Sequence, residues 1–139
     1  MVPTNIRVIY GDTDRMGVVY YANYLRFFEA GRNEFLRAAG ARYRDVEAEH
    51  GIMFPVVEAN VVYRHPARYD DMIRVETSIA ELKRASLRFT YRVVRVEDER
   101  LLAEGHTVHA CIDREHKPTR LPEPVAALLR GATSPAETA

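Results

Sequence analysis

The sequence has few of the features that mark several large protein classes. Its 139 residues include one cysteine, Cys111, and no tryptophan. A single cysteine cannot form an internal disulfide, which excludes a disulfide-stapled fold. No apolar run approaches the roughly 20 residues of a membrane-spanning helix, and residues 1–5 have neither a basic nor an apolar segment. We therefore expect a cytoplasmic protein with no signal peptide and no membrane contact.

An excess of charge of one sign is also missing. Twenty Lys and Arg residues balance twenty Asp and Glu residues, so the composition does not favour nucleic acid as a partner. Apolar residues make up 47% of the chain and charged residues 29%, which is ordinary for a globular protein. The length fits one domain, which we place at residues 1–130. Residues 131–139 are small and polar and are expected to form a flexible C-terminal tail.

Several motifs of well-known sites are absent. The chain contains no G-x-S-x-G elbow, no G-x-x-x-x-G-K phosphate loop and no G-x-G-x-x-G dinucleotide fingerprint. His106 and His109 are three residues apart in a predicted strand, so they point to opposite faces and do not predict a metal site. Cys111 lies in an apolar stretch and is expected in the core. We expect neither a metal nor a cofactor.

The hydrophobic periodicity predicts an α+β fold. Residues 5–10 alternate weakly, which indicates a short strand. Helical spacing predicts a long helix over 23–39 with Tyr24, Phe28 and Phe35 on its apolar face, Leu25 beside them, and Gly40 at its end. The remaining expected elements are a helix at 43–50, strands at 56–64, 73–79, 87–93 and 101–112, the last with Gly105 as a candidate bulge, and a helix at 122–129.

Two carboxylates stand in the loop between the first strand and the long helix. Asp12 and Asp14 lie at residues 11–17, a segment whose Gly-Asp-Thr-Asp composition is typical of a turn. The start of a helix has unpaired backbone N–H groups and a partial positive charge, so it favours an anion or a polarised carbonyl. A carboxylate beside such a helix start has the parts needed for acyl transfer. The alternative is that both aspartates only cap turn amides.

Residues 12–29 read D-T-D-x-x-G-V-V-Y-Y-A-N-Y-L-R-F-F-E. This pattern resembles the N-terminal signature of hotdog-fold acyl-CoA thioesterases of the 4-hydroxybenzoyl-CoA thioesterase and YbgC-like group. Residues 63–71 and 81–86 also resemble the family, and the resemblance covers residues 4–112. It implies a long central helix wrapped by a curved five-stranded antiparallel sheet, an acyl-CoA substrate, and a homodimer that assembles into a homotetramer.

The resemblance also implies roles for residues of the loop and helix start. Asp14 is expected to attack the thioester carbonyl or to activate water, and these two roles stay open. Asp12 is expected to stabilise the loop. The backbone amide of Tyr21 is expected to polarise the thioester carbonyl. Many relatives have histidine at this position, so no acid-base role is implied for the Tyr21 side chain. The alternative for Tyr20, Tyr21 and Tyr24 is packing at the helix entrance.

A second expected site is basic. Lys83, Arg84 and Ser86 match a turn where the family places side chains that bind the phosphates of coenzyme A. Ala85 interrupts the basic run, so the clamp is expected to be weaker or to be completed by another subunit. The alternative is that the two basic residues form an ordinary solvated turn.

Two other functions fit parts of the pattern. A hotdog dehydratase pairs a carboxylate with a catalytic histidine, and the absence of histidine from residues 1–49 counts against this function. A non-catalytic acyl-CoA-binding or sensor module could retain the same aspartate. The sequence does not specify the acyl group.

Overall fold

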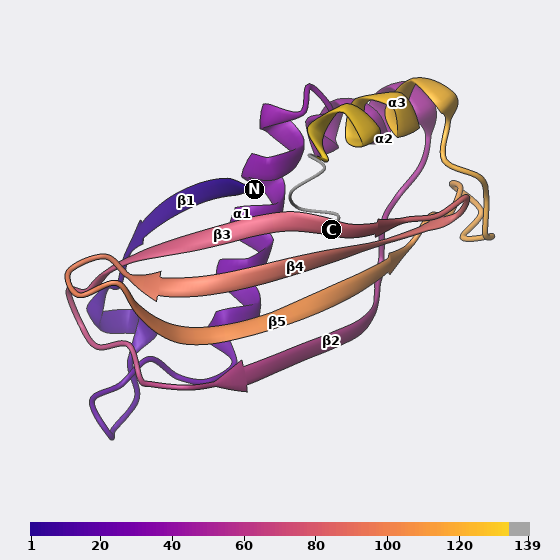
Figure 1. The fold of residues 1–139 in the computed structure, drawn as a ribbon. Coiled ribbons are helices and arrows are strands. Elements are labelled where there is room, and N and C mark those ends of the chain that lie inside the picture. Colours follow the sequence, from indigo (N-terminus) through magenta and orange to yellow (C-terminus); the bar gives the residue numbers. More distant parts are fainter. Residues whose placement is uncertain (134–139) are drawn as a thin grey trace.

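A computed structural model describes residues 1–133, and in it a single antiparallel sheet carries helices on its surface (Figure 1). The strands are β1 (Val2–Arg7), β2 (Val56–Tyr63), β3 (Met72–Leu82), β4 (Ser86–Arg95) and β5 (Arg100–Ala110). Their order across the sheet is β1-β3-β4-β5-β2. β1 and β2 therefore form the two edges. Residues 134–139, most of the expected tail, lie outside the described residues.

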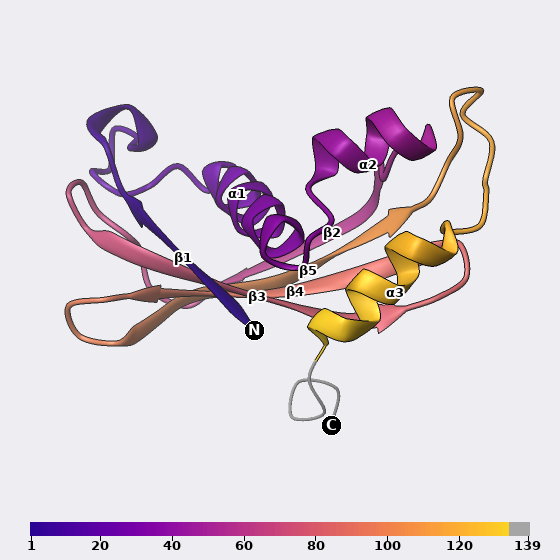
Figure 2. The ribbon, with the colours of Figure 1, turned by 90° about the horizontal axis from the view of Figure 1, so that it is seen from above.

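Three α-helices and one 3₁₀ turn complete the described chain. They are α1 (Asn23–Ala38), α2 (Tyr43–His50), α3 (Glu123–Ala132) and η1 (Tyr10–Asp12). Figure 2 shows α1 crossing one face of the curved sheet. The predicted α+β architecture, a long helix against a curved five-stranded antiparallel sheet, is confirmed.

The apolar stripe of α1 forms the centre of the core. Phe28 stacks on Tyr91 of β4 with ring centroids 4.2 Å apart. A Cβ atom on Gly31 would lie 2.5 Å from the Thr77 hydroxyl oxygen, so glycine lets the helix approach β3 closely. Leu25, expected beside the apolar stripe, is 42% exposed. The helix buries one face and leaves the side of Leu25 open.

Two local expectations were wrong. The first strand was expected at residues 5–10 but spans Val2–Arg7. The chain turns back after Arg7, where the buried Asp12 carboxylate accepts the Ile9 amide at 2.9 Å. Gly105 is not in a bulge, since it pairs regularly with Tyr91 on β4 and Val61 on β2. Glycine is needed there because a Cβ atom would meet the neighbouring backbone of β2.

None of the described helices has both the length and the apolar character of a membrane-crossing helix.

Candidate functional site

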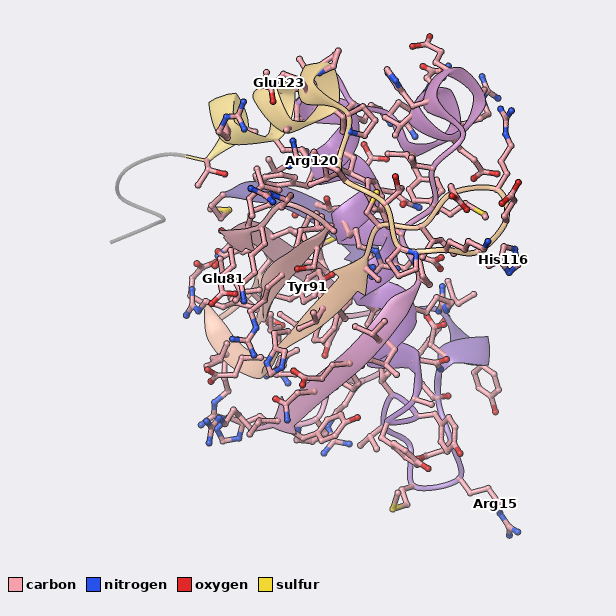
Figure 3. All side chains as sticks on the ribbon, turned by 90° about the vertical axis from the view of Figure 1, so that its right-hand side faces the viewer. Arg15, Glu81, Tyr91, His116, Arg120 and Glu123 are labelled. Atoms are coloured by element: carbon pink, nitrogen blue, oxygen red, sulfur yellow. The ribbon has the colours of Figure 1, made fainter. Side chains whose placement is uncertain are left out.

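The loop after η1 fixes the backbone of Asp14. Asp14 donates its amide to the Val18 carbonyl at 2.9 Å and accepts the Gly17 amide at 3.0 Å. Gly17 has φ +79°, a conformation that glycine adopts without strain. One carboxylate oxygen of Asp14 accepts the Met16 amide at 2.8 Å, and the other has no partner among residues 1–133. Arg15 points away from the molecule at the loop tip (Figure 3). The loop therefore presents a carboxylate with one free oxygen.

Asp12 has the structural role that the sequence predicted for it. Its side chain is buried, 4% exposed, and it forms an ion pair with Arg26. Its backbone carbonyl accepts the Tyr20 amide and the Asn23 side-chain amide, each at 2.9 Å. Asp12 thus joins the loop to the first turn of α1, and this prediction is confirmed.

The start of α1 lacks a side-chain cap. The N-cap residue is Ala22, and the first turn contains no acidic residue. Within the described part of the chain, the backbone amides of Tyr21 and Ala22 donate no hydrogen bond. Unpaired amides at a helix start attract anions and carbonyl oxygens. An acceptor for them would have to come from solvent or a ligand.

A pocket of about 300 Å³ lies between the Asp14 loop, the start of α1 and the end of β2. It is lined by Asp14, Met16, Val18, Val19, Tyr21, Tyr24, Tyr63, Arg64, His65 and Pro66. Backbone contacts between residues 18–19 and 67–68 close it, including the Val19 amide to the Ala67 carbonyl at 2.9 Å. The fold therefore brings the predicted carboxylate and Tyr21 into one pocket.

Two of the pocket tyrosines are structural. The Tyr63 hydroxyl donates to the Tyr21 carbonyl at 2.9 Å, and the Tyr24 hydroxyl accepts the Ala67 amide at 3.2 Å. Burial raises the pKa of Tyr24 and of Tyr63, so both phenols keep their protons near neutral pH. The Tyr21 side chain is different, since it is 61% exposed. These contacts hold the helix entrance against the β2–β3 connection.

His65 is the pocket residue that the sequence did not identify. The absence of histidine from residues 1–49 counted against a dehydratase, but it does not leave the helix entrance without a histidine. The structure brings His65 from the β2–β3 connection into the pocket of Asp14. No local signal shows this, because the bridge between Val18 and Arg68 joins segments about 50 residues apart.

The predicted coenzyme A clamp lies at the other end of the sheet. Lys83 and Arg84 are exposed in the β3–β4 turn, where the Lys83 amide donates to the Ser86 carbonyl at 2.8 Å. Lys83 has Glu81 as an ion-pair partner at 3.6 Å. The 11 residues of β3 separate this turn from the Asp14 end by roughly 35 Å. One protomer does not bring the two predicted sites together.

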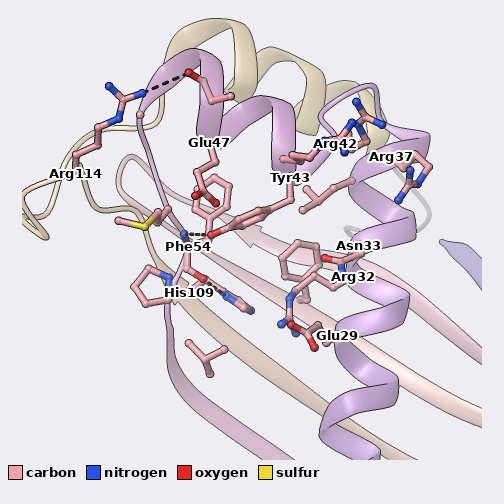
Figure 4. A pocket seen from close by; sticks show the side chains of 18 residues that line it. Glu29, Arg32, Asn33, Arg37, Arg42, Tyr43, Glu47, Phe54, His109 and Arg114 are labelled. Atoms are coloured by element: carbon pink, nitrogen blue, oxygen red, sulfur yellow. Dashed lines mark hydrogen bonds between the residues drawn. The ribbon is translucent and has the colours of Figure 1, made fainter.

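A larger pocket of about 960 Å³ lies near this far end, between α1, α2 and the start of β2 (Figure 4). Its walls carry several arginines, and a buried chain of polar side chains lies behind them. Arg32 donates to the Tyr91 hydroxyl at 3.3 Å, and that hydroxyl lies 2.6 Å from the Thr107 hydroxyl. Thr107 in turn contacts His109 at 2.8 Å, and His109 contacts the Phe54 carbonyl at 3.0 Å.

The carbonyl of Phe54 determines the direction of every bond in this chain. It can only accept, so Nδ1 of His109 carries a hydrogen and Nε2 accepts from Thr107. Thr107 then accepts from Tyr91. Burial lowers the pKa of His109 to about 4, and the positive charge of Arg32 acts in the same direction. The neutral imidazole of His109 is therefore a structural part of the folded core.

His106 and His109 lie on opposite faces of β5, as predicted. His106 is on the outer face, 2.6 Å from the Glu58 carboxylate and 3.1 Å from Arg88. Among residues 1–133, no group of three or more His, Cys, Asp or Glu side chains has an arrangement that could hold a metal ion.

Known proteins share the fold and much of the sequence of this chain. The acyl-CoA thioester hydrolase YbgC of Escherichia coli O6:H1 is 40% identical over 88% of this chain and 90% of its own. A crystal structure of a hypothetical protein from Thermus thermophilus matches with a TM-score of 0.89 and 42% identity, over 94% and 98% of the two chains. A Synechocystis 1,4-dihydroxy-2-naphthoyl-CoA thioesterase matches with a TM-score of 0.84 and 25% identity, over 92% and 94%.

The family model described as the thioesterase-like superfamily matches residues 8–129, which include the Asp14 loop, the whole sheet except β1, and most of α3. The resemblance seen in the sequence is thereby confirmed, and the chain belongs to the thioesterase-like superfamily.

Proposed function

We propose that this protein hydrolyses the thioester bond of an acyl-CoA and releases the free acid and CoA. The observation that carries the proposal is the pocket that Asp14 shares with Tyr21 at the uncapped start of α1. The names of the relatives support the same reaction class. No acyl group is assigned, because the aromatic side chains at the helix entrance also pack in the core and therefore do not identify a substrate.

We infer a distinct task for each group. The Tyr21 amide donates a hydrogen bond to the thioester oxygen, whose negative charge grows as the carbonyl carbon becomes tetrahedral. A donor of this kind typically lowers the barrier by roughly 3–4 kcal/mol. The free oxygen of Asp14 either attacks that carbon or takes a proton from an attacking water. In both cases the C–S bond breaks and its electron pair goes to sulfur.

The proposed assembly follows from β2. Among residues 1–133 this strand pairs with β5 alone, which leaves its outer edge unpaired there, and its Val56 and Val57 are 48% and 61% exposed. Pairing with the same strand of a second copy would cover that edge and form a homodimer. The homotetramer and the cytoplasmic location expected from the sequence remain predictions.

The same pairing would bring the predicted coenzyme A clamp of one copy to the Asp14 end of the other. Two antiparallel β2 strands set the end of one beside the start of the other. The start of β2 lies at the sheet end that carries the β3–β4 turn. Lys83, Arg84 and Ser86 of a second copy would then lie at the Asp14 end of the first, about 15–20 Å to the side of its β2. We assign the phosphate clamp to the partner subunit.

The Asp14→Asn variant tests the reaction. We expect it to keep the wild-type melting temperature and to lose at least about 100-fold of thiol release from a panel of short, long and aromatic acyl-CoAs. Asp12→Asn is the contrasting variant, because loss of a buried charge partner should reduce the free energy of unfolding by about 1–3 kcal/mol.

One outcome would reject the role of Asp14, and two others would reject the proposed reaction. Asp14→Asn could release thiol as fast as wild type, which would remove Asp14 from the chemistry. The wild-type protein could form a 2,3-enoyl thioester without free thiol, which would indicate a dehydratase. It could also bind acyl-CoA tightly without turnover, which would indicate a sensor.

A further inference from the structure

The pocket contains a histidine with no assigned task. The backbone of His65 is fixed by its amide, which donates to the Leu102 carbonyl at 3.1 Å. Next to it, the Pro66 carbonyl accepts from Arg95 at 2.9 Å. The imidazole of His65 has no hydrogen-bond or ion-pair partner among the described residues, although it lines the pocket of Asp14. A fixed backbone with a free imidazole leaves the ring available to a substrate.

Other pocket side chains are less suited to transfer a proton to the leaving group. Arg64 pairs with Glu104 at 3.2 Å, and a guanidinium does not lose its proton in proteins. The hydroxyls of Tyr24 and Tyr63 are engaged in backbone contacts, and burial raises the pKa of each. Among the described residues that line the pocket, the Tyr21 hydroxyl is the competing donor. Imidazole is the side chain that ordinarily exchanges protons near neutral pH.

We propose that His65 is a catalytic residue that protonates the sulfur leaving group, a role that rests on the thioesterase function proposed above. With Asp14 as general base, water attacks the carbonyl carbon and its proton passes to the carboxylate. When the C–S bond breaks, the sulfur takes both bonding electrons and the proton of the His65 imidazolium. The proton on Asp14 then returns to imidazole through solvent. Thioester and water become acid and thiol, with every proton accounted for.

The test varies the leaving group at a constant acyl group. Acyl-CoA and acyl-pantetheine release an alkyl thiolate, which is a strong base and gains from protonation. The 4-nitrothiophenyl ester of the same acid releases a weakly basic thiolate that departs without a proton. We expect His65→Asn to lower kcat/KM about 10- to 100-fold for the alkyl thioesters. For the aryl ester we expect a change of less than about twofold, because no proton is needed there.

Matched variants separate this role from a structural one. His116→Asn replaces another exposed histidine in a distant turn where φ is +64°, a conformation asparagine tolerates, and it should leave both esters unaffected. His65→Gln repeats the measurement if the asparagine variant has a lower melting temperature. Tyr21→Phe keeps the backbone amide and removes the competing hydroxyl.

Several results would overturn the role of His65. An equal loss of kcat/KM for alkyl and aryl esters in His65→Asn would mean that His65 only positions the substrate. No loss for either ester would remove His65 from the reaction. A selective loss in Tyr21→Phe but not in His65→Asn would give the role to the phenol. If Asp14→Asn stays active while His65→Asn shows the selective loss, the role of Asp14 fails and that of His65 stands. If the wild-type protein releases no thiol from any ester, both fail.

Discussion

The backbone contact at Gly105 gives a sharp stability prediction. Gly105 lies in the middle of β5 and faces α1. A Cβ atom there would lie 2.0 Å from the Asn60 carbonyl oxygen and 3.0 Å from Cε2 of Phe28. Close carbon–oxygen contacts between strands are normally about 3.3 Å or longer. In Gly105→Ala, β2 must therefore move by about 1 Å, because a backbone carbonyl cannot rotate aside as a side chain can.

The expected cost follows from this movement. Overpacking a tight site typically costs about 1–3 kcal/mol, and here the displaced atom belongs to the backbone of β2. Alanine recovers about 0.5–1 kcal/mol because it restricts the unfolded chain more than glycine does. We expect Gly105→Ala to lose about 2 kcal/mol of unfolding free energy, a decrease of roughly 8 °C in melting temperature for a chain of this size.

Urea unfolding followed by circular dichroism measures this loss, since the chain has no tryptophan to report by fluorescence. Gly131→Ala in α3 is the matched control, because nothing lies within 4 Å of its Cβ position. That variant should gain up to about 1 kcal/mol from helix propensity. Wild type and both variants are measured at the same protein concentration, so that any oligomer contributes equally to their stability. If Gly105→Ala unfolds at the wild-type urea concentration, the close approach of β2 and β5 is wrong.

Two further predictions concern His109 and the proposed partner contact. The pKa of His109 is lowered from 6.5 to about 4, so the unfolded chain takes up a proton first as pH falls, and folding should lose about 2 kcal/mol between pH 6.5 and 5. A urea midpoint that stays constant over this range would contradict the buried neutral imidazole. For the partner contact, chains with Asp14→Asn are refolded together with chains carrying Lys83→Ala and Arg84→Ala. About a quarter of the wild-type sites should be intact, all of them in mixed dimers, and their activity is measured at low substrate concentration. No recovery of activity would mean that the clamp lies within one protomer or does not exist.

The sequence predicted what depends on short-range periodicity. Tyr24, Phe28 and Phe35 mark the buried side of α1, and their spacing alone indicates a helix across an apolar surface. The end of α1 was also predicted, because a glycine commonly follows the last helical turn. In the structure Gly40 has φ +83° at this position. Strand alternation gave the centres of β3 and β4 but not their full lengths. Ala80 and Glu81 near the end of β3 are both exposed, and in β4 the register shifts between Val93 and Val94, which are both buried.

Contacts between distant segments could not be predicted from spacing. His65 reaches the pocket because the β2–β3 connection pairs with the loop that follows Asp14, and neither segment encodes that pairing locally. Gly105 shows the same limit. A glycine inside a strand indicates either a bulge or a close backbone approach. Only the register of β2 against β5 shows that the carbonyl of Asn60 occupies the space.

The start of α1 links these points to function. An N-cap side chain typically stabilises a helix by about 0.5–2 kcal/mol. Asn23 has a side chain of the capping type, but it donates to the Asp12 carbonyl at 2.9 Å and holds the loop instead. Ala22 occupies the N-cap position and supplies no acceptor. A thioester oxygen bound at this point would supply the missing acceptor, so the stabilisation that a cap would give to the free protein would instead be gained as charge develops on the substrate.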